Sequence, residues 1–581
     1  MASSGGKPTV ENGVALVLQP NGFIVEQLTY VDPIEKAMQE AAGGQDVPET
    51  LLYDLIDAIE NAKDDKRITS LVISTSYLWG TGVSKLEDLS KVITDFKQSG
   101  KKVIAFGDYF SQSQYFLAAQ ADEVIMNPQG GILLTGFSRI GTYFKSLLDQ
   151  LGINVHVFKV GTYKSAVEPY IRDNMSDEAK LANKEWMSDL WSEFKENIAN
   201  SRSITSDDIA SYINHYKENL LAANGDTAKI ALDAGLVDNL MTRIEFRNKM
   251  IALVGMDDKT KSYKNISHFE YLKAIRPAVE TINPHTNKVA VITTKGEILD
   301  GEHKEGVIGG DTIARLIRKT RNNKNVKAIV LRVDSGGGSA FASEVIRQEL
   351  VKAQNDGIKV VTSMGDVAAS GGYLIAASSD EIWAHPTTIT GSIGVYGMFP
   401  TFEKPLNKWG VFRDGVGTTK YSNPIDSGMP LSDDFAQIIQ SGVEATYDNF
   451  ITLVSEGRGM SKSDVDKIAQ GRVWSGKKAH EIGLVDHLGG LTDAIKSAAK
   501  LAEMDDYDIL HVKRKLSENE IFLKQLFNQS QMQDLVHQKQ RVNQKYGLKE
   551  KLMNEISSGL KLLSQWNDPN NTYAICFCEV N

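Results

Sequence analysis

Two glycine-rich loops carry the residue types that nucleophilic catalysis requires. One reads Ala-Ala-Ser-Gly-Gly-Tyr and places Ser370 directly before Gly371. The other reads Asp-Ser-Gly-Gly-Gly-Ser and covers residues 334–339. Glycines let the backbone approach a ligand closely, and a serine beside free backbone N–H groups has the parts of a nucleophile with an oxyanion hole. The structural alternatives are that Ser370 only caps a helix and that the glycines only form turns.

The chain contains two copies of one unit. The 22 residues that begin at Gly107 and the 22 that begin at Gly365 are identical at eight positions without a gap. The offset of 258 residues also holds for the apolar run that precedes each segment. Further matches follow in the same order at offsets from 248 to 275. An ordered series of this kind indicates a tandem duplication.

Only the second copy has the serine and the glycines. The offset of 258 places Gln112 opposite Ser370. At an offset of 259, Thr-Ser-Tyr-Leu-Trp-Gly, residues 75–80, stands opposite the glycine loop 334–339. A feature needed only for folding should survive in both copies, so the difference favours catalysis at Ser370.

A serine nucleophile needs a base, and two lysines occupy matching positions. Gly-Thr-Tyr-Lys ends at Lys164 in the first copy, and Gly-Thr-Thr-Lys ends at Lys420 in the second. Burial lowers the pKa of a lysine, and the neutral amine can then accept a proton. Lys164 has the more apolar neighbours; the alternative for either lysine is a solvated surface position. His385 is the histidine nearest to Ser370 in sequence, and we expect it at the end of a strand.

Short apolar runs alternate with segments of helical periodicity along both copies. This pattern predicts an α/β fold in which helices cover mostly parallel sheets. Both glycine loops follow predicted strands, and ligands collect at the carboxyl ends of parallel strands. The first copy is expected to span residues 12–280 and the second 286–505. Residues 506–581, rich in Gln, Lys and Leu, predict a helical C-terminal tail.

Net charge, apolar runs and cysteine spacing argue against several classes of protein. The chain has 581 residues, and its net charge of −10 argues against a nucleic-acid partner. No apolar run is long enough to span a membrane, and the polar start, Met-Ala-Ser-Ser-Gly-Gly, does not resemble a signal peptide.

Cys576 and Cys578 have neither redox nor zinc spacing, so we interpret them as tail residues. No metal or other cofactor is implied.

Several longer segments resemble one bacterial family. They are Val-His-Val-Phe-Lys-Val-Gly-Thr-Tyr-Lys-Ser-Ala-Val-Glu-Pro-Tyr-Ile-Arg-Asp-Asn-Met-Ser (155–176), the stretch 328–350 around the glycine loop, Ala-Ala-Ser-Gly-Gly-Tyr, Thr-Gly-Ser-Ile-Gly-Val-Tyr-Gly (390–397), 466–476 and 567–576. Together they resemble signal peptide peptidase A, or protease IV, in its long tandem-repeat form. The resemblance covers nearly the whole chain.

The resemblance implies a serine protease with a Ser–Lys dyad and a unit of the crotonase/Clp-protease superfamily. Carried over by position, Ser370 is the nucleophile and Lys164 the general base. Gly371 and either Gly337 or Gly338 donate to the oxyanion. The family degrades cleaved signal peptides, which are extended and apolar, and forms homo-oligomers, expected to be tetramers. It is held at the inner membrane, facing the periplasm, by an N-terminal anchor that we expect to precede this chain.

Two departures from the family pattern bear on the site. Gly336 stands where the family usually has proline, which should loosen the loop without removing the donor glycines. Lys420 matches the lysine of single-repeat relatives, but its partner would be the Gln112 site, so we interpret it as a remnant. Two other functions stay open at this stage: an acyl-CoA enzyme of the same superfamily, which would use a carboxylate, and a peptide-binding scaffold without catalysis.

Overall fold

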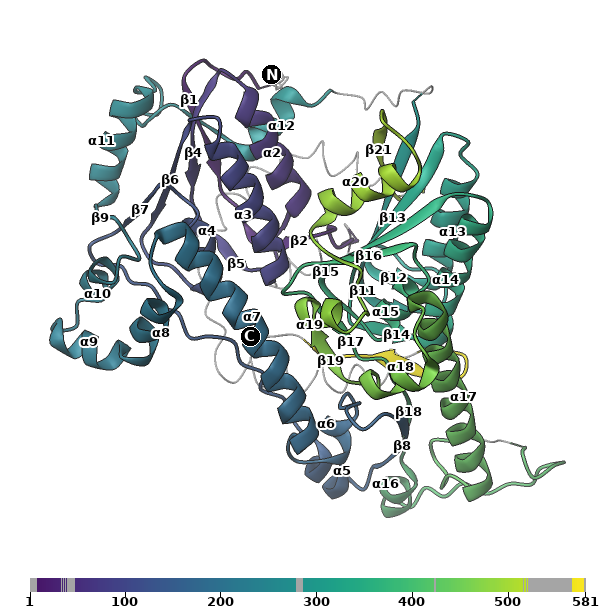
Figure 1. Ribbon diagram of the computed structural model, residues 1–581. Coiled ribbons are helices and arrows are strands. Elements are labelled where there is room, and N and C mark those ends of the chain that lie inside the picture. Colours follow the sequence, from purple (N-terminus) through teal and green to yellow (C-terminus); the bar gives the residue numbers. More distant parts are fainter. Residues whose placement is uncertain are drawn as a thin grey trace.

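Two α/β lobes, one for each predicted copy, lie side by side (Figure 1). This computed structural model describes residues 8–32, 34, 36, 38, 47–277, 286–422, 425–515, 517, 518, 520 and 567–578. Each lobe has its own hydrophobic core around its own sheet. The duplication in the sequence therefore corresponds to two folded units.

The first lobe is built on a parallel sheet of six strands. In spatial order they are β10 (Asn265–Ser267), β1 (Val14–Leu18), β4 (Ile68–Ile73), β6 (Lys102–Gly107), β7 (Glu123–Met126) and β9 (Asn239–Leu240). A second parallel sheet contains β3 (Glu49–Leu51), β2 (Gly22–Val25) and β5 (Leu78–Gly80). The helices are α2 (Leu52–Asp64), α3 (Val83–Lys97), α4 (Gln112–Ala118), α8 (Ser206–Asn214), α9 (Tyr216–Ala222), α10 (Thr227–Asp233), α11 (Arg243–Val254) and α12 (His268–Ile275). Every residue of β1 is buried, as expected for a parallel strand covered on both faces.

The second lobe repeats this strand order. Its parallel strands are β21 (Asp508–His511), β11 (Lys288–Leu299), β13 (Val326–Ser335), β15 (Lys359–Ala369), β16 (Glu381–Ala384) and β20 (His487–Leu488). The helices are α13 (Gly310–Arg321), α14 (Ala340–Asn355), α15 (Gly371–Ala376), α17 (Asp433–Arg458), α18 (Lys462–Ile468), α19 (Gly476–Glu481) and α20 (Leu491–Leu501). Shorter strands are β12 (Gly306–Gly309), β14 (Gly337–Ser339), β17 (Ile389–Gly391) and β19 (Val473–Ser475). The shared order confirms the predicted tandem α/β units.

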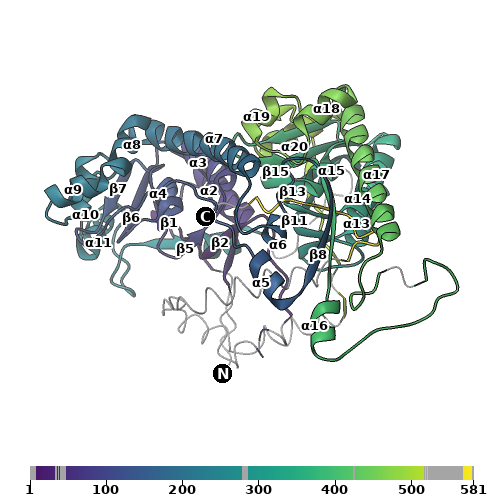
Figure 2. The ribbon, with the colours of Figure 1, turned by 90° about the horizontal axis from the view of Figure 1, so that it is seen from below.

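Segments of the first repeat extend onto the second lobe. Strand β8 (Asn154–Val160) pairs antiparallel with β18 (Val395–Thr401), and α5 (Lys145–Leu151), α6 (Glu168–Ile171) and α16 (Glu403–Lys408) lie beside this ladder (Figure 2). The long helix α7 (Asp177–Arg202) then crosses between the lobes. Its Asp189 accepts a hydrogen bond from Ser475 at 2.6 Å. The two repeats are thus joined by a ladder and by a helix.

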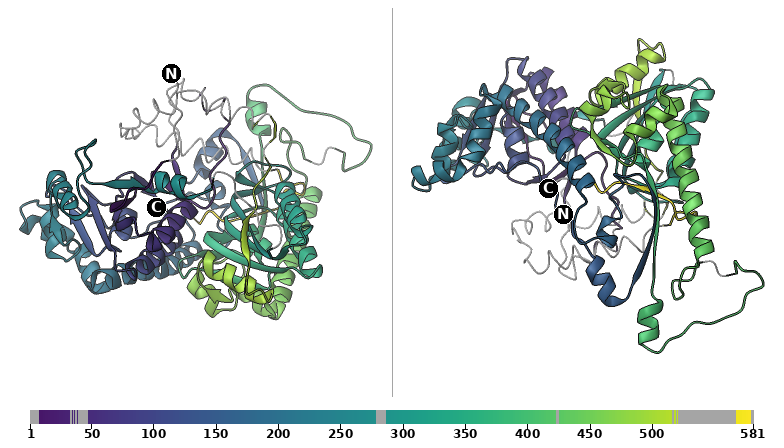
Figure 3. Two further views of the ribbon diagram at one scale, coloured as in Figure 1. Left: turned by 90° about the horizontal axis from the view of Figure 1, so that it is seen from above. Right: turned by 60° about the horizontal axis from the view of Figure 1, so that its bottom comes forward.

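Two described segments of the predicted helical tail form strands instead of helix. Residues 508–511 are β21, which belongs to the sheet of the second lobe, and Tyr573–Ile575 form β22. Strand β22, yellow in Figure 3, lies within the second lobe. Most of the segment for which we predicted a helix, residues 521–566, lies outside the described residues. Across the described chain, no helix has both the length and the apolar character needed to cross a bilayer.

Candidate active site

Ser370 lies at the junction between β15 and α15, as the sequence predicted. Its backbone has a φ of 58° and a ψ of −115°, an uncommon conformation for a residue other than glycine. The Ser370 amide donates to the Gly391 carbonyl at 2.8 Å, and its carbonyl accepts from the Leu374 amide. The side chain has no solvent exposure. Two backbone hydrogen bonds fix this strained turn, and the Ser370 side chain makes no capping hydrogen bond to the helix that follows.

Lys164 comes from the first repeat and reaches the second lobe through the β8–β18 ladder. The loop after β8 packs against residues 470–471, where the Tyr163 amide donates to the Gln470 carbonyl at 2.8 Å. A β-carbon on Gly471 would lie 2.7 Å from the Lys164 amide nitrogen, so only glycine permits this approach. The ladder and the loop contact together fix the lysine beside Ser370.

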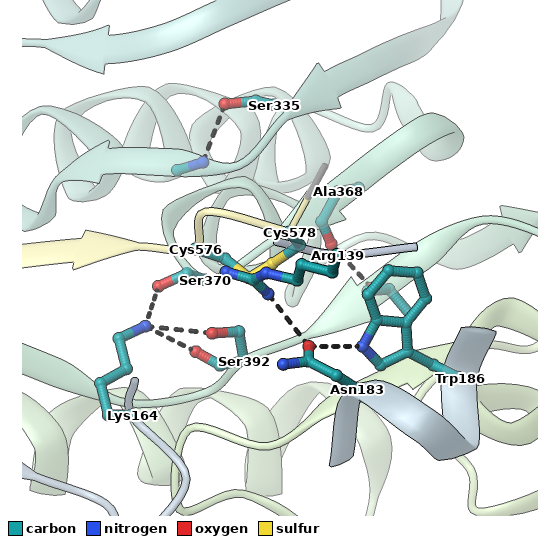
Figure 4. The surroundings of a disulfide bond; sticks show 12 residues. Arg139, Lys164, Asn183, Trp186, Ser335, Ala368, Ser370, Ser392, Cys576 and Cys578 are labelled. Carbon is teal, nitrogen blue, oxygen red and sulfur yellow. Dashed lines mark hydrogen bonds between the residues drawn. A yellow bond between two sulfur atoms is a disulfide. The ribbon is translucent and has the colours of Figure 1, made fainter. Parts of the chain in front are cut away.

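The Lys164 amine has three polar neighbours (Figure 4). Its Nζ lies 2.7 Å from Ser370 Oγ and 3.1 Å from both the carbonyl oxygen and the Oγ of Ser392. The side chain is buried, and this burial lowers the pKa of Lys164 well below its ordinary value of 10.5. The site therefore favours the neutral amine.

Ser392 was not identified from the sequence. Its backbone has a φ of 50°, and its amide donates to the Arg472 carbonyl at 2.6 Å. A signal was present: both copies contain Thr-Gly, at residues 135–136 and 390–391, but Phe137 follows in the first and Ser392 in the second. The comparison of copies that singled out Ser370 would also have found this serine.

The two glycine loops meet beside Ser370. A β-carbon on Gly337 would lie 2.6 Å from the Gly371 amide nitrogen, and one on Gly371 would lie 3.1 Å from the Gly338 amide nitrogen. The Gly337 amide itself donates to Ser335 Oγ at 3.0 Å, and Gly337 has a φ of 99°. The structure thus brings the three predicted glycines together. Gly337 provides the turn, and the amides of Gly338 and Gly371 lie near each other.

The two cysteines are close to this site, although the sequence placed them in a tail. Cys576 and Cys578 are joined by a disulfide near Ser370 (Figure 4). Cys578 is buried in a cluster with Trp186 and Ala369. The interpretation as tail residues missed this placement, because nothing in a C-x-C spacing indicates which surface the segment contacts.

A buried ion cluster connects helix α3 of the first repeat with the strands that lead into both glycine loops. Lys85 Nζ lies 2.8 Å from Asp334 and also contacts Asp366. Burial lowers the pKa of Lys85, but these carboxylates outweigh it and raise the pKa above the ordinary value. Asp334 directly precedes Ser335, and its Oδ1 accepts from the Val367 amide. Helix α3 of the first repeat therefore contacts the ends of the strands from which both glycine loops begin.

His385 and Lys420 have no part in the Lys164–Ser370 contact. His385 follows β16, as predicted, and is buried between Glu87 at 3.1 Å and Asp88 at 3.1 Å. Lys420 is exposed and pairs with Asp434 at 2.9 Å. In this chain Lys420 does not face Gln112, whose Oε1 accepts instead from the amides of residues 135 and 136.

Comparison with known proteins identifies the family. Residues 95–256 and 352–505 match peptidase family S49. The chain is 41% identical to Protease 4 of Haemophilus influenzae over 86% of its length and 81% of that protein. It is 36% identical to Protease 4 of Salmonella typhi over 98% of its length and 90% of that protein. A putative signal peptide peptidase SppA of Enterococcus faecium is 34% identical over 34% of this chain and 57% of that protein. The chain is therefore a serine protease that belongs to peptidase family S49.

Proposed function

We propose that the protein is a serine endopeptidase in which Ser370 is the nucleophile and Lys164 the general base. The observation that carries this proposal is the 2.7 Å distance between Lys164 Nζ and Ser370 Oγ in a fully buried setting. A neutral amine has two N–H groups and one lone pair. The Ser392 carbonyl and hydroxyl accept the two N–H groups, which leaves the lone pair for the Ser370 proton.

The reaction follows from this geometry. Lys164 takes the Ser370 proton as Oγ forms a bond to the carbonyl carbon of the scissile peptide. The amides of Gly371 and Gly338 donate to the oxyanion, each at a benefit of about 3–4 kcal/mol. The carbon–nitrogen bond then breaks, and the leaving amine takes the proton from Lys164. Water then attacks the ester carbonyl and gives its proton to the neutral Lys164 amine. When the ester bond breaks, Lys164 returns this proton to Ser370 Oγ.

The substrates we propose are cleaved signal peptides and other extended, apolar peptides. Support comes from the resemblance to signal peptide peptidase A and from the name of the Enterococcus faecium relative. We further propose that the protein acts at the inner membrane, on the periplasmic side, as a homo-oligomer, expected to be a tetramer. These proposals rest on family resemblance.

Active-site labelling tests the proposal. A fluorophosphonate probe should modify Ser370, and Ser370→Ala should remove both labelling and peptide hydrolysis. The fold should be unchanged, because alanine at a helix start costs about 1 kcal/mol. Ser113→Ala, at the corresponding helix start of the first repeat, is the control and should keep both labelling and hydrolysis. Hydrolysis by Ser370→Ala at the wild-type rate would refute the assignment. Labelling without hydrolysis of any peptide would argue against an endopeptidase.

A further inference from the structure

Strands β13 and β15 change register just before the two glycine loops. Val333 pairs with Met364 and Ser335 pairs with Ala368, so the one residue between them on β13 faces three residues on β15. A bulge of this kind changes the direction of the strand that carries it. It directly precedes the glycine loop on one strand and the proposed nucleophile on the other. The shape of the bulge therefore sets how the two proposed oxyanion amides lie relative to each other.

Two carboxylates lie in this bulge, one from each strand. Asp334 Oδ1 accepts a hydrogen bond from the Val367 amide at 3.2 Å, which joins β13 to the bulged part of β15. Asp334 and Asp366 have side chains only 15% and 19% exposed, and both contact Lys85 Nζ, Asp334 at 2.8 Å. Two carboxylates that share one site repel each other. The arrangement of the bulge thus depends on the cation between them.

The cation comes from helix α3, on the side of the first lobe that faces the second (Figure 1). Ser84 Oγ of this helix donates to Asp366 Oδ1 at 2.6 Å. A β-carbon on Gly82, which directly precedes the helix, would lie 1.9 Å from Asp366 Cγ, so a larger residue there would displace the carboxylate. Asp366 therefore lies at the N-terminus of α3, where the helix dipole favours negative charge. Lys85 is 3% exposed, so the contact is closed to solvent.

Short segments, hydrogen-bonded to the sheet, connect the bulge to both oxyanion donors. On β13, Ser335 Oγ donates to the Gly296 carbonyl at 2.6 Å and accepts from the Gly337 amide at 3.0 Å. On β15, residues 367–369 pair with β17 up to the junction with Ser370. Because both segments are bonded in this way, a shift of the bulge would also shift the two loops.

We propose that Lys85 is a positioning residue for the oxyanion hole. This inference rests on the proposed function. The Lys85 ammonium holds Asp334 and Asp366 together, and through the bulge it fixes the separation of the two oxyanion amides. The first repeat therefore supplies two lysines to one site. Lys164 moves the proton, and Lys85 keeps the donors of the second repeat in place.

Lys85→Met in the full chain tests this role, because methionine keeps an unbranched side chain but has no charge. A misplacement of about 1 Å can cost about 10²-fold in rate, so kcat on a fluorogenic apolar peptide should fall by about 10²-fold. KM should change by less than about twofold, because the hole acts in the transition state. The pH midpoint of kcat/KM, which reports Lys164, should not move.

A peptide aldehyde measures the oxyanion hole itself. The adduct of acetyl-Leu-Leu-norleucinal with Ser370 places an oxyanion against the two amides, so its affinity for Lys85→Met should fall in parallel with kcat. Lys91→Met is the matched control: Lys91 lies on the same helix and contacts Asp493 in α20 at 2.8 Å. This control should keep both values. Wild-type kcat in Lys85→Met, or a lower kcat with unchanged aldehyde affinity or a shifted pH midpoint, would overturn the proposal.

A charge-balanced variant covers the case in which Lys85→Met does not fold. Lys85→Met combined with Asp366→Asn removes one positive and one negative charge, so the melting temperature should stay near that of the wild type. The cation between the strands is still absent, and kcat and aldehyde affinity should again fall by about 10²-fold. Wild-type kcat in this double variant would overturn the proposal, because Lys85 would then only neutralise the cluster. Hydrolysis by Ser370→Ala at the wild-type rate would instead refute the proposed function itself.

Discussion

Lys164 Nζ and Ser370 Oγ lie 2.7 Å apart although 206 residues separate them in the chain. They come from different repeats, and the β8–β18 ladder brings them together. Neither lobe alone contains both groups.

The two matching lysines should behave differently. Lys164→Ala should lower kcat by at least about 10³-fold, in the range of general-base contributions. Lys420→Ala should change it by less than about twofold, because an exposed ion pair contributes little. Initial rates with a fluorogenic peptide would measure both. An inactive Lys420 variant beside an active Lys164 variant would place the base in the second repeat.

Activity should depend on the protonation of Lys164. Burial lowers its pKa, so the competent neutral amine forms as pH rises through a value well below 10.5. The logarithm of kcat/KM should therefore rise with pH at unit slope and level off far below the titration of free lysine. A profile that still rises steeply above pH ~10 would show that the base is not desolvated.

Removal of the Ser392 hydroxyl should weaken catalysis without abolishing it. The hydroxyl provides one of three polar contacts to Lys164 Nζ, and one hydrogen bond is worth about 1 kcal/mol, or roughly 5- to 10-fold in rate. Serine and alanine both carry a β-carbon, so Ser392→Ala removes the hydroxyl without new strain at the positive φ of residue 392, and Ser392→Gly also relieves the strain already there. Both variants should lose similar activity, and melting curves should show that both stay folded. Wild-type kcat in Ser392→Gly would show that the hydroxyl has no role.

The contact between repeats should respond to pH through His385. Burial lowers its pKa, but Asp88 and Glu87 outweigh it and raise the pKa to about 10. The folded pKa exceeds the unfolded one, so the stabilisation is complete below pH ~6.5 and is lost as pH rises towards about 10. His385→Gln should lower the denaturation midpoint most at pH 6 and least at pH 10. His487→Gln, at a half-exposed position, is the control and should show little change across this range. An equal effect of His385→Gln at both pH values would contradict the charged pair.

The fold was largely predictable because its signals are local. Apolar runs and glycine loops at a constant offset predicted two α/β units and located Ser370 and Gly371 at the start of a helix. Strands were underestimated in length: β15 continues from the apolar run through Gly365 to Ala369, where pairing with β13 and β17 outweighs local propensity.

The contacts that complete the site could not be predicted in the same way. Ser392 contacts Lys164 through a turn with positive φ, and Lys85 contacts Asp334 across the two repeats. Such contacts depend on how the two lobes pack against each other. The spacing of apolar residues along the sequence does not predict that packing. The C-terminal strand is the clearest case, because its composition favours no particular partner and its place is set by the open edges of β14 and β18.

The ladder between β8 and β18 also bears on how the duplicated gene could change. With the proposed dyad, the lysine of one copy serves the serine of the other, so a substitution such as Gln112 in the first copy would not reduce activity. Each repeat would then need the other for activity. A chain cut between residues 277 and 286 should stay active, because the ladder holds the halves together. The same halves, expressed separately and kept apart, should be two inert proteins.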